Sequence, residues 1–138
     1  MNSNEVVLRF CIWGFDDITH DEISKALGVN PTKVYIKGQR KHANFSALAK
    51  ENGWLFEPDY DRYASFQDKL AFLLQFLTPR TEVIKEYCKK YKCEISCGVY
   101  IYFENGESTP SIYLNTEYNR IIKELDIAFD VDIICLPN

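Results

Sequence analysis

The sequence predicts an α+β protein in which helices pack on one face of a mostly antiparallel sheet. β-rich runs and amphipathic helical segments alternate along the chain in the approximate order βαββααββαβ. Capping residues mark where several helices begin, and glycine or proline marks where several strands stop. This order places helices and sheet in separate layers, and a ferredoxin-like arrangement is one form that it can take.

The first unit is a strand followed by a short helix with both ends specified. Residues 6–13 are rich in β-formers and stop at Gly14. Thr19 is the expected N-cap, and Glu22 three residues later completes a capping box. Gly28 suits the left-handed residue that ends a helix. We therefore expect a helix from about Thr19 to Leu27.

Two short strands follow, on either side of a stretch whose form the pattern leaves open. Residues 33–36 and 53–57 predict strands, and Pro58 stops the second one. Residues 39–51 between them fit either an irregular loop or one helical turn. Such a turn would use Phe45, Leu48 and Ala49.

Capping and spacing predict two further helices. Ser65-x-x-Asp68 is a capping pattern, and Thr78-Pro79 combines an N-cap with proline at the first helical position. Apolar residues then recur at intervals of three and four, as on one face of a helix. They are Phe66, Leu70, Leu73 and Leu77 in the first helix and Val83, Ile84, Tyr87 and Tyr91 in the second.

The C-terminal part predicts three strands and a helix. Residues 94–103 form the clearest strand, and Asn105-Gly106 is a dipeptide favoured in tight turns. A second strand is expected at residues 111–114. Asn115 or Thr116 would cap the helix that follows, and residues 129–136 would form the last strand.

The order of elements contains a weak internal repeat. The strand, helix and strand of residues 6–36 recur in residues 112–134. Aligning Leu27 with Leu125 matches Ile23 to Ile121. The sequence therefore predicts a weak pseudo-repeat, which we interpret as architectural similarity and not as duplication.

Length and composition indicate one domain, residues 1–138, with a packed core. The chain is 46% hydrophobic and 14% aromatic, which is typical of folded domains. Its cysteine count is odd and its first residues lack a leader pattern, so we expect reduced thiols in the cytoplasm. No apolar run approaches the ~20 residues that span a bilayer, which argues against a membrane protein. The net charge of -4 disfavours a general nucleic-acid binder.

The sequence offers no convincing catalytic residue. It has two histidines, and His20 at the start of the first helix is expected to be solvated. The acidic residues around it are explained by helix capping, because carboxylates stabilise a helix N-terminus. The chain also has no phosphate-binding glycine motif. We therefore predict no catalytic and no cofactor-binding residue.

The cysteines do not predict a metal centre. Cys88, Cys93 and Cys97 follow a C-x4-C-x3-C spacing, whereas structural zinc sites use a closer pair or its equivalent. Cys97 lies in a predicted strand, as Cys11 and Cys135 do, and burial as small apolar residues is expected for them. No metal ligand is assigned.

The candidate partner-binding residues are basic and aromatic. A basic segment around residues 33–42 stands out in an acidic chain. It is either a solvated turn or a binding site for a phosphate or an acidic protein surface. Trp54 and Phe56 are expected in the core, whereas Tyr60 and Tyr63 lie among charges and are expected to be exposed. Aromatic side chains are common at interaction hot spots. The assigned candidates are Lys37, Arg40, Lys41, His42, Tyr60 and Tyr63.

Several separated pieces together resemble a known family. They are Gly14-Phe15-Asp16-Asp17, residues 27–32, Lys37-Gly38, Gly53-Trp54, Leu77-Thr78-Pro79 and residues 114–134. In this order they resemble the bacterial family named domain of unknown function 4279, over nearly the whole chain. The resemblance implies a small bacterial protein without an assigned activity, and immunity or partner binding near toxin systems for some members. Residues 40–52 depart from the family pattern and look longer and more helical.

These observations lead to one principal hypothesis and two alternatives. The principal one is a non-enzymatic cytosolic protein that binds a protein partner, with an immunity-type inhibitor of a toxin as its specific form. The first alternative is a small-molecule-binding domain or small enzyme that uses the open face of the sheet. The second is RNA binding through strand aromatics such as Tyr100 and Tyr102, which the charge disfavours. Homo-oligomer formation stays open.

Overall fold

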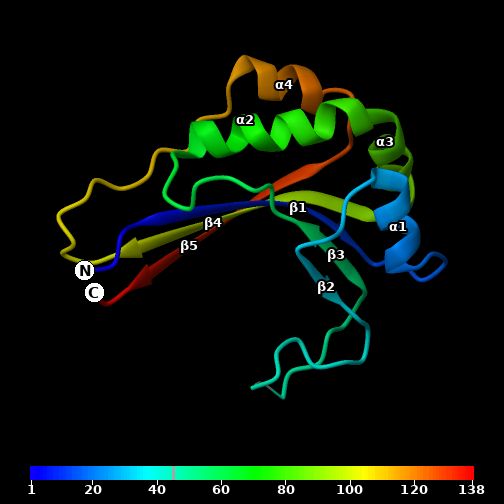
Figure 1. Cartoon of the computed structure of the whole chain (residues 1–138), viewed down its shortest axis with the longest axis horizontal. Coiled ribbons are helices and arrows are strands. Elements are labelled where there is room, and N and C mark those ends of the chain that lie inside the picture. The colour runs from blue at the N-terminus through cyan, green and yellow to red at the C-terminus, as the bar shows by residue number, and fades with distance from the viewer. Residues whose placement is uncertain (45) are drawn as a thin grey trace.

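The computed structural model describes residues 1–44 and 46–138, and it shows one five-stranded sheet with helices packed on one of its faces (Figure 1). The predicted α+β class is confirmed. The strand order is β2-β3-β1-β4-β5. The elements are β1 (Glu5–Trp13), α1 (His20–Leu27), β2 (Lys33–Tyr35), β3 (Gly53–Phe56), α2 (Phe66–Leu77), the 3-10 turn η1 (Thr78–Arg80), α3 (Thr81–Lys90), β4 (Lys92–Tyr102), α4 (Thr116–Ile122) and β5 (Ala128–Leu136).

The sheet is built from two interleaved strand–helix–strand units. β1 and β2 flank β3, and β3 and β4 flank β1, with antiparallel pairing at each of these contacts. This is the ferredoxin-like order, so that prediction is confirmed for the first four strands. β5 then adds to β4 in parallel, after the chain has crossed over through α4. A parallel neighbour requires such a crossover.

Side-chain capping explains where α1, α2 and α4 begin, whereas the N-cap predicted at Thr78 is wrong, because Thr78 ends α2 and starts the turn η1, and α3 begins at Thr81 without a side-chain cap. Thr19 and Glu22 form the predicted capping box, with the Glu22 N–H 3.1 Å from the Thr19 hydroxyl. Gly28 ends α1 in the left-handed conformation at φ 73°. Of the two proposed caps for α4, Asn115 is the N-cap, and its side chain accepts a hydrogen bond from the Tyr118 N–H.

The core lies between the sheet and the helices. Alternate residues of β1, beginning at Val6, face the helices and are buried. The face predicted for α2 is confirmed, since its four apolar residues are all buried, whereas Ile84 alone is buried among the four predicted for α3. Trp54 is fully buried, as expected, and its indole N–H donates to the Ser24 hydroxyl of α1.

The strand predicted at residues 111–114 is wrong. The edge of β4 that it would occupy is taken by β5, in register from Glu94–Ala128 to Tyr102–Leu136. Residues 111–114 run instead beside α2, where the Gln67 side chain donates to the Tyr113 carbonyl at 2.7 Å. Gly106 does take a left-handed turn conformation, but no hairpin follows it in the described chain. The predicted pseudo-repeat therefore lacks the first strand of its second copy.

Residues 36–44 and 46–52 form an arm that extends from the β2 and β3 edge of the sheet (Figure 1). In its described part this arm is extended and not helical, because its two sides bond to each other. The Lys41 N–H donates to the Ala47 carbonyl, and Ala49 exchanges hydrogen bonds with Gly38 and Gln39. The helical turn considered for this segment is therefore wrong for its described residues, and Phe45 lies outside them.

The N-terminal half of β1 receives hydrogen bonds from side chains on one edge. β3 ends opposite Phe10, so Leu8 has no strand beside it there. The Leu8 N–H donates to the Tyr60 hydroxyl at 3.0 Å, and that hydroxyl donates a hydrogen bond to the Glu57 carboxylate at 2.6 Å. Tyr60 is therefore half-buried and not exposed as expected, because its hydroxyl satisfies the backbone that a strand would otherwise bond.

A buried lysine continues this side-chain edge. Lys69 of α2 is 0% exposed, and its ammonium donates to the carbonyls of Val6 and Arg62. The same ammonium lies 4.6 Å from the centroid of the Tyr60 ring, within cation–π distance. Burial lowers the pKa of Lys69, and Glu5 opposes that shift. The charge is tolerated inside the protein because carbonyl dipoles and the ring replace water.

We expect Tyr60→Phe to lower the free energy of unfolding by about 1–2 kcal/mol, because the Leu8 N–H loses its acceptor. Chemical denaturation followed by circular dichroism measures this change. Tyr63→Phe is the matched control, since Tyr63 is 57% exposed, and it should change the same quantity by less than about 0.5 kcal/mol. Equal effects of the two substitutions would contradict a bonding role for the Tyr60 hydroxyl.

Candidate functional site

The face of the sheet opposite the helices is uncovered, and strand alternation determines its residues. β1 presents Arg9, Cys11 and Trp13 on this open face, while its even-numbered residues point to the core. Glu94 of β4 pairs with Cys11 and therefore shares this face. Tyr35 of β2 reaches the same surface from the far edge.

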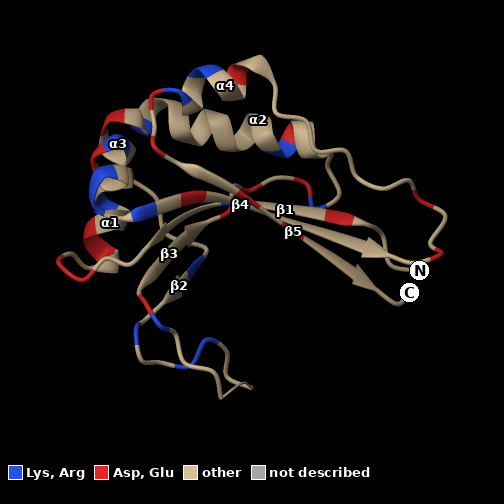
Figure 2. Cartoon of the chain, turned by 180° about the vertical axis from the view of Figure 1, so that it is seen from behind, with Lys and Arg blue, Asp and Glu red and all other residues tan. Residues whose placement is uncertain are grey.

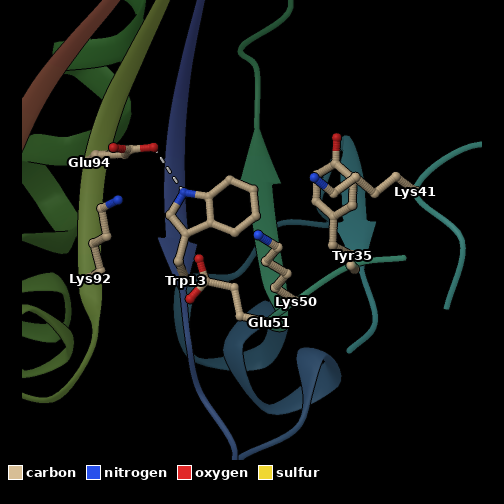
Figure 3. A pocket seen from close by; sticks show the side chains of 8 residues that line it. Trp13, Tyr35, Lys41, Lys50, Glu51, Lys92 and Glu94 are labelled. Atoms are coloured by element: carbon tan, nitrogen blue, oxygen red, sulfur yellow. Dashed lines mark hydrogen bonds between the residues drawn. The ribbon is translucent and has the colours of Figure 1, made fainter. Parts of the chain in front are cut away.

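One end of the open face is hollowed where the arm meets the sheet. This open-face hollow has a volume of about 310 Å³, within the range of small-molecule sites. Figure 3 shows its side chains, which come from β1, β2, β4 and the arm. They belong to Trp13, Tyr35, Lys41, Ala49, Lys50, Glu51, Lys92 and Glu94.

Two aromatic rings form the floor of the hollow. The Trp13 and Tyr35 rings are stacked, with centroids 5.4 Å apart and planes 28° from parallel. Both residues pair across the strands with Gly53. A Cβ atom on Gly53 would lie 2.5 Å from the Trp13 ring, so the missing side chain lets the rings lie over the strand. The Trp13 indole N–H donates to Glu94 at 3.0 Å, which fixes the ring.

The rim of the hollow is charged. It carries three lysines and two glutamates, and one of these acids, Glu94, is already bonded to the indole. Figure 3 shows Lys41 beside the Tyr35 ring, Lys50 between the Trp13 and Tyr35 rings, and Lys92 on the β4 side. A fourth lysine, Lys33, places its ammonium 4.8 Å from the centroid of the Tyr35 ring. The rings and these ammonium groups together suit a ligand that has both an apolar part and a negative charge.

Asn52 holds the base of the arm. Its side-chain oxygen accepts from the Lys37 N–H at 2.9 Å, and its side-chain amide donates to the Phe15 carbonyl at 2.7 Å. Its own carbonyl accepts from the Gly14 N–H. These bonds tie the arm to the loop after β1, so the arm lysines are held beside the hollow.

The structure divides the six predicted partner-binding residues into two groups. Lys41 lines the hollow, and the other basic candidates belong to the same arm, where Lys37 lies 4.0 Å from Asp16 and His42 lies 3.4 Å from Lys33. Figure 2 shows the basic residues along the arm. Tyr60 and Tyr63 lie near the opposite end of β1, where Tyr63 lines a separate depression with the N-terminal residues. The structure therefore does not join the tyrosines to the basic segment.

The aromatic floor is the part of the site that sequence reasoning missed. Trp13 stands at the end of a recognised strand and Tyr35 within another, and each was interpreted only as a strand residue. Their common neighbour, Gly53, is a signal, because glycine in a strand often marks close approach of another group. That signal identifies a contact only when the strand register is known.

His20 is not solvated, contrary to expectation. Its Nε2 lies 2.9 Å from the Tyr35 carbonyl, and its ring meets the edge of Phe15 with centroids 4.9 Å apart. An imidazole beside a carbonyl oxygen donates its N–H, so this histidine supports β2 from α1. Its role in the described structure is to position Tyr35.

The cysteines are mostly packing residues. Cys11 and Cys97 are buried as predicted, and burial raises the pKa of Cys11 to about 12 and that of Cys97 to about 11. Cys135 is exposed, contrary to prediction, because β5 is an edge strand that the helices do not cover there. A hydrogen bond from the Cys93 thiol lowers the pKa of Cys88. Residues 1–44 and 46–138 contain no cluster of three or more metal-ligating side chains.

Of three comparisons with known proteins, one found a match. The model of the family described as "Domain of unknown function (DUF4279)" matches residues 4–136. No curated protein and no solved structure matches the chain. Within the described residues, no helix has the length and apolar character needed to cross a membrane.

We expect Gly53→Ala to lower the free energy of unfolding by about 1–3 kcal/mol, because the new methyl group overlaps the Trp13 ring. Chemical denaturation measures this change. Gly98→Ala is the matched control on the same face, where the nearest contact is the Tyr100 ring at 3.2 Å, and we expect a smaller loss. A larger loss for the control would contradict the role assigned to Gly53.

We expect Cys135 to react with a soluble thiol reagent at about pH 8 well before Cys11. It is exposed, whereas burial keeps Cys11 protonated and out of reach. Peptide mass spectrometry after timed labelling of the native protein measures the order of reaction. Labelling of Cys11 as fast as Cys135 in the folded state would contradict the burial of Cys11.

Proposed function

We propose that this chain, which belongs to the family described as "Domain of unknown function (DUF4279)", is a non-enzymatic module that binds a protein partner. The open-face hollow would receive an acidic segment of that partner. We further propose that the protein acts in the bacterial cytoplasm, and that its specific form is an immunity-type inhibitor, which binds a toxin and blocks it.

The observation that carries this proposal is the aromatic floor beside the lysines of the arm. Trp13 and Tyr35 offer rigid ring faces to an apolar side chain, and such rings are frequent interaction hot spots. Lys41 and Lys50 lie next to these rings and suit carboxylates of the partner. The site is already formed, because Gly53 and Glu94 hold the rings, so less ordering is needed on binding.

The arm extends the binding surface beyond the hollow. Lys37, Arg40 and Lys41 are exposed on it, although the whole chain carries a net charge of -4. A local basic surface on an acidic protein attracts an acidic partner and raises its association rate. The contacts of Asn52 keep this surface in a fixed direction relative to the hollow.

The lining of the hollow favours binding over catalysis. Its described side chains include no histidine, cysteine, serine or threonine, so the nucleophile and histidine base of a typical small hydrolase are not among them, and its glutamates, lysines and tyrosine are groups that also bind ligands. Of the two histidines, His20 is bonded to the Tyr35 carbonyl, and His42 lies 3.4 Å from the Lys33 ammonium beside the Tyr35 ring. The described hollow therefore offers stacking and charge complementarity as its chemistry.

A second candidate function uses the same hollow for a small planar anion. Its volume of about 310 Å³ is large enough for such a ligand, and its stacked rings suit a planar group. Native mass spectrometry of the protein purified from its own organism distinguishes the two candidates. A stoichiometric small-molecule adduct that Trp13→Ala removes would favour this second function over protein binding.

We expect Lys41→Glu/Lys50→Glu to weaken partner binding by about tenfold or more, because both charges that face the acidic segment are reversed. The measurement is quantitative capture from the native organism, followed by titration of the captured protein. Protection from the product of an adjacent toxin gene, scored as growth on co-expression, tests the immunity form.

Lys90→Glu/Lys123→Glu is the matched control, because it makes the same charge change at exposed positions on the helix side of the protein. This control should bind like the wild type. Equal capture by wild type and by both double variants would overturn the assignment of the hollow. Loss of binding in the control alone would place the interface on the helices.

A further inference from the structure

The fold leaves one long backbone edge without a partner in the described structure. The sheet ends in β2 on one side and β5 on the other. β2 has three residues and follows closely after Pro31, and short edges of this kind resist pairing with other chains. The gap on β1 is closed by Tyr60 and Lys69. β5, with nine residues, has no such protection among the described residues.

β5 is a regular strand. Its register with β4 is continuous over nine residue pairs, without a bulge. It contains no proline, glycine or lysine that would interrupt or protect the edge, and its charged residues are the two aspartates Asp130 and Asp132. The strand therefore presents an extended template for a further strand.

The direction of its free backbone groups follows from one hydrogen bond. The Leu136 carbonyl accepts from the Phe103 N–H at 3.1 Å, so Leu136 turns its backbone groups toward β4. Backbone direction alternates along a strand. The N–H and C=O groups of Val131, Ile133 and Cys135 therefore point away from the sheet, where β5 has no described neighbour.

The same three residues have exposed apolar side chains. Val131 is 40% exposed and Ile133 is 67% exposed, and Cys135 is exposed as well. Their register partners on β4 face the helices, so these side chains lie on the helix face of the sheet, beyond the region that the helices cover. Unsatisfied backbone and apolar side chains therefore coincide along one strip.

We propose that β5 pairs antiparallel with β5 of a second copy of this chain, about a two-fold axis at Ile133. The two Ile133 residues would then exchange both backbone hydrogen bonds, and Val131 of each copy would lie opposite Cys135 of the other. Two five-stranded sheets would thereby join into one continuous sheet. This interface is separate from the hollow, so it goes beyond the proposed function and does not depend on it.

A second copy paired in this register keeps the carboxylates of the two β5 strands apart. Asp130 and Asp132 lie on the other face of β5. With the axis at Ile133, Asp132 lies opposite Ile134 of the second copy and Asp130 lies opposite Leu136, so no carboxylates meet directly. An axis at Asp132 would place two carboxylates opposite each other, which is destabilising. The axis at Ile133 therefore joins the apolar strip to its own copy without facing carboxylates.

The first experiment is sedimentation velocity of the full chain over a range of concentrations. We expect a dimer whose dissociation constant rises about tenfold or more in Ile133→Pro, which removes the central donor. The monomer fold should survive, because proline is tolerated on an edge strand when its N–H would face outward. Should that variant fail to fold, Ile133→Lys tests the same contact through its side chain. Phe72→Lys changes an exposed apolar residue on α2 and should leave the dimer intact.

The second experiment tests the register. Under mild oxidation, the thiol introduced by Val131→Cys in one copy should form a disulfide with Cys135 of the other, and peptide mass spectrometry identifies the link. A wild-type protein that stays monomeric at every concentration would overturn the proposal. So would a dimer that resists both Ile133 variants, or one in which the introduced thiol links only to other positions.

Discussion

β1 needs hydrogen-bond partners along both of its edges, and much of the fold follows from how they are supplied. β4 pairs with one edge from Glu5 to Trp13. The other edge is shared between β3 and two side chains, the Tyr60 hydroxyl and the Lys69 ammonium. The buried Lys69 ammonium and the half-buried Tyr60 hydroxyl lie there because β1 extends beyond the end of β3. Because β3 is short, Lys69 of α2 bonds to the part of β1 that β3 leaves unpaired.

The sequence predicts local features of this fold well, and long-range pairings less well. The cap at Thr19 and the apolar face of α2 are set by residues a few positions apart, and both were recognised correctly. The segment around Tyr113 has the composition of a strand, yet β5 occupies the edge of β4 that it would join. Which segment pairs with the edge of β4 depends on contacts made by the whole chain, so a local residue pattern does not predict it.

In the candidate site, too, the locally determined features are predicted from sequence and the long-range contacts are not. Lys41 was recognised as part of a basic segment, and it does line the hollow. Trp13 and Tyr35 come together because both face Gly53 across different strands, and that pairing depends on a register set by distant residues. Tyr60 and Tyr63 are close in sequence to each other and distant from the arm in the structure. Charge clusters along the chain are visible in sequence, whereas aromatic stacking between strands requires the fold.

The pairing at the end of β1 and β3 places the two tryptophans of the chain on opposite faces of the sheet. Ile12 pairs with Trp54 in the core, and Trp13 pairs with Gly53 beneath the hollow. Trp54 is fully buried and Trp13 is partly exposed. The protein thus carries two intrinsic fluorophores in different surroundings. A change at the open face therefore acts on the surroundings of Trp13, and loss of the core acts on the surroundings of Trp54, so the chain carries an intrinsic probe of each.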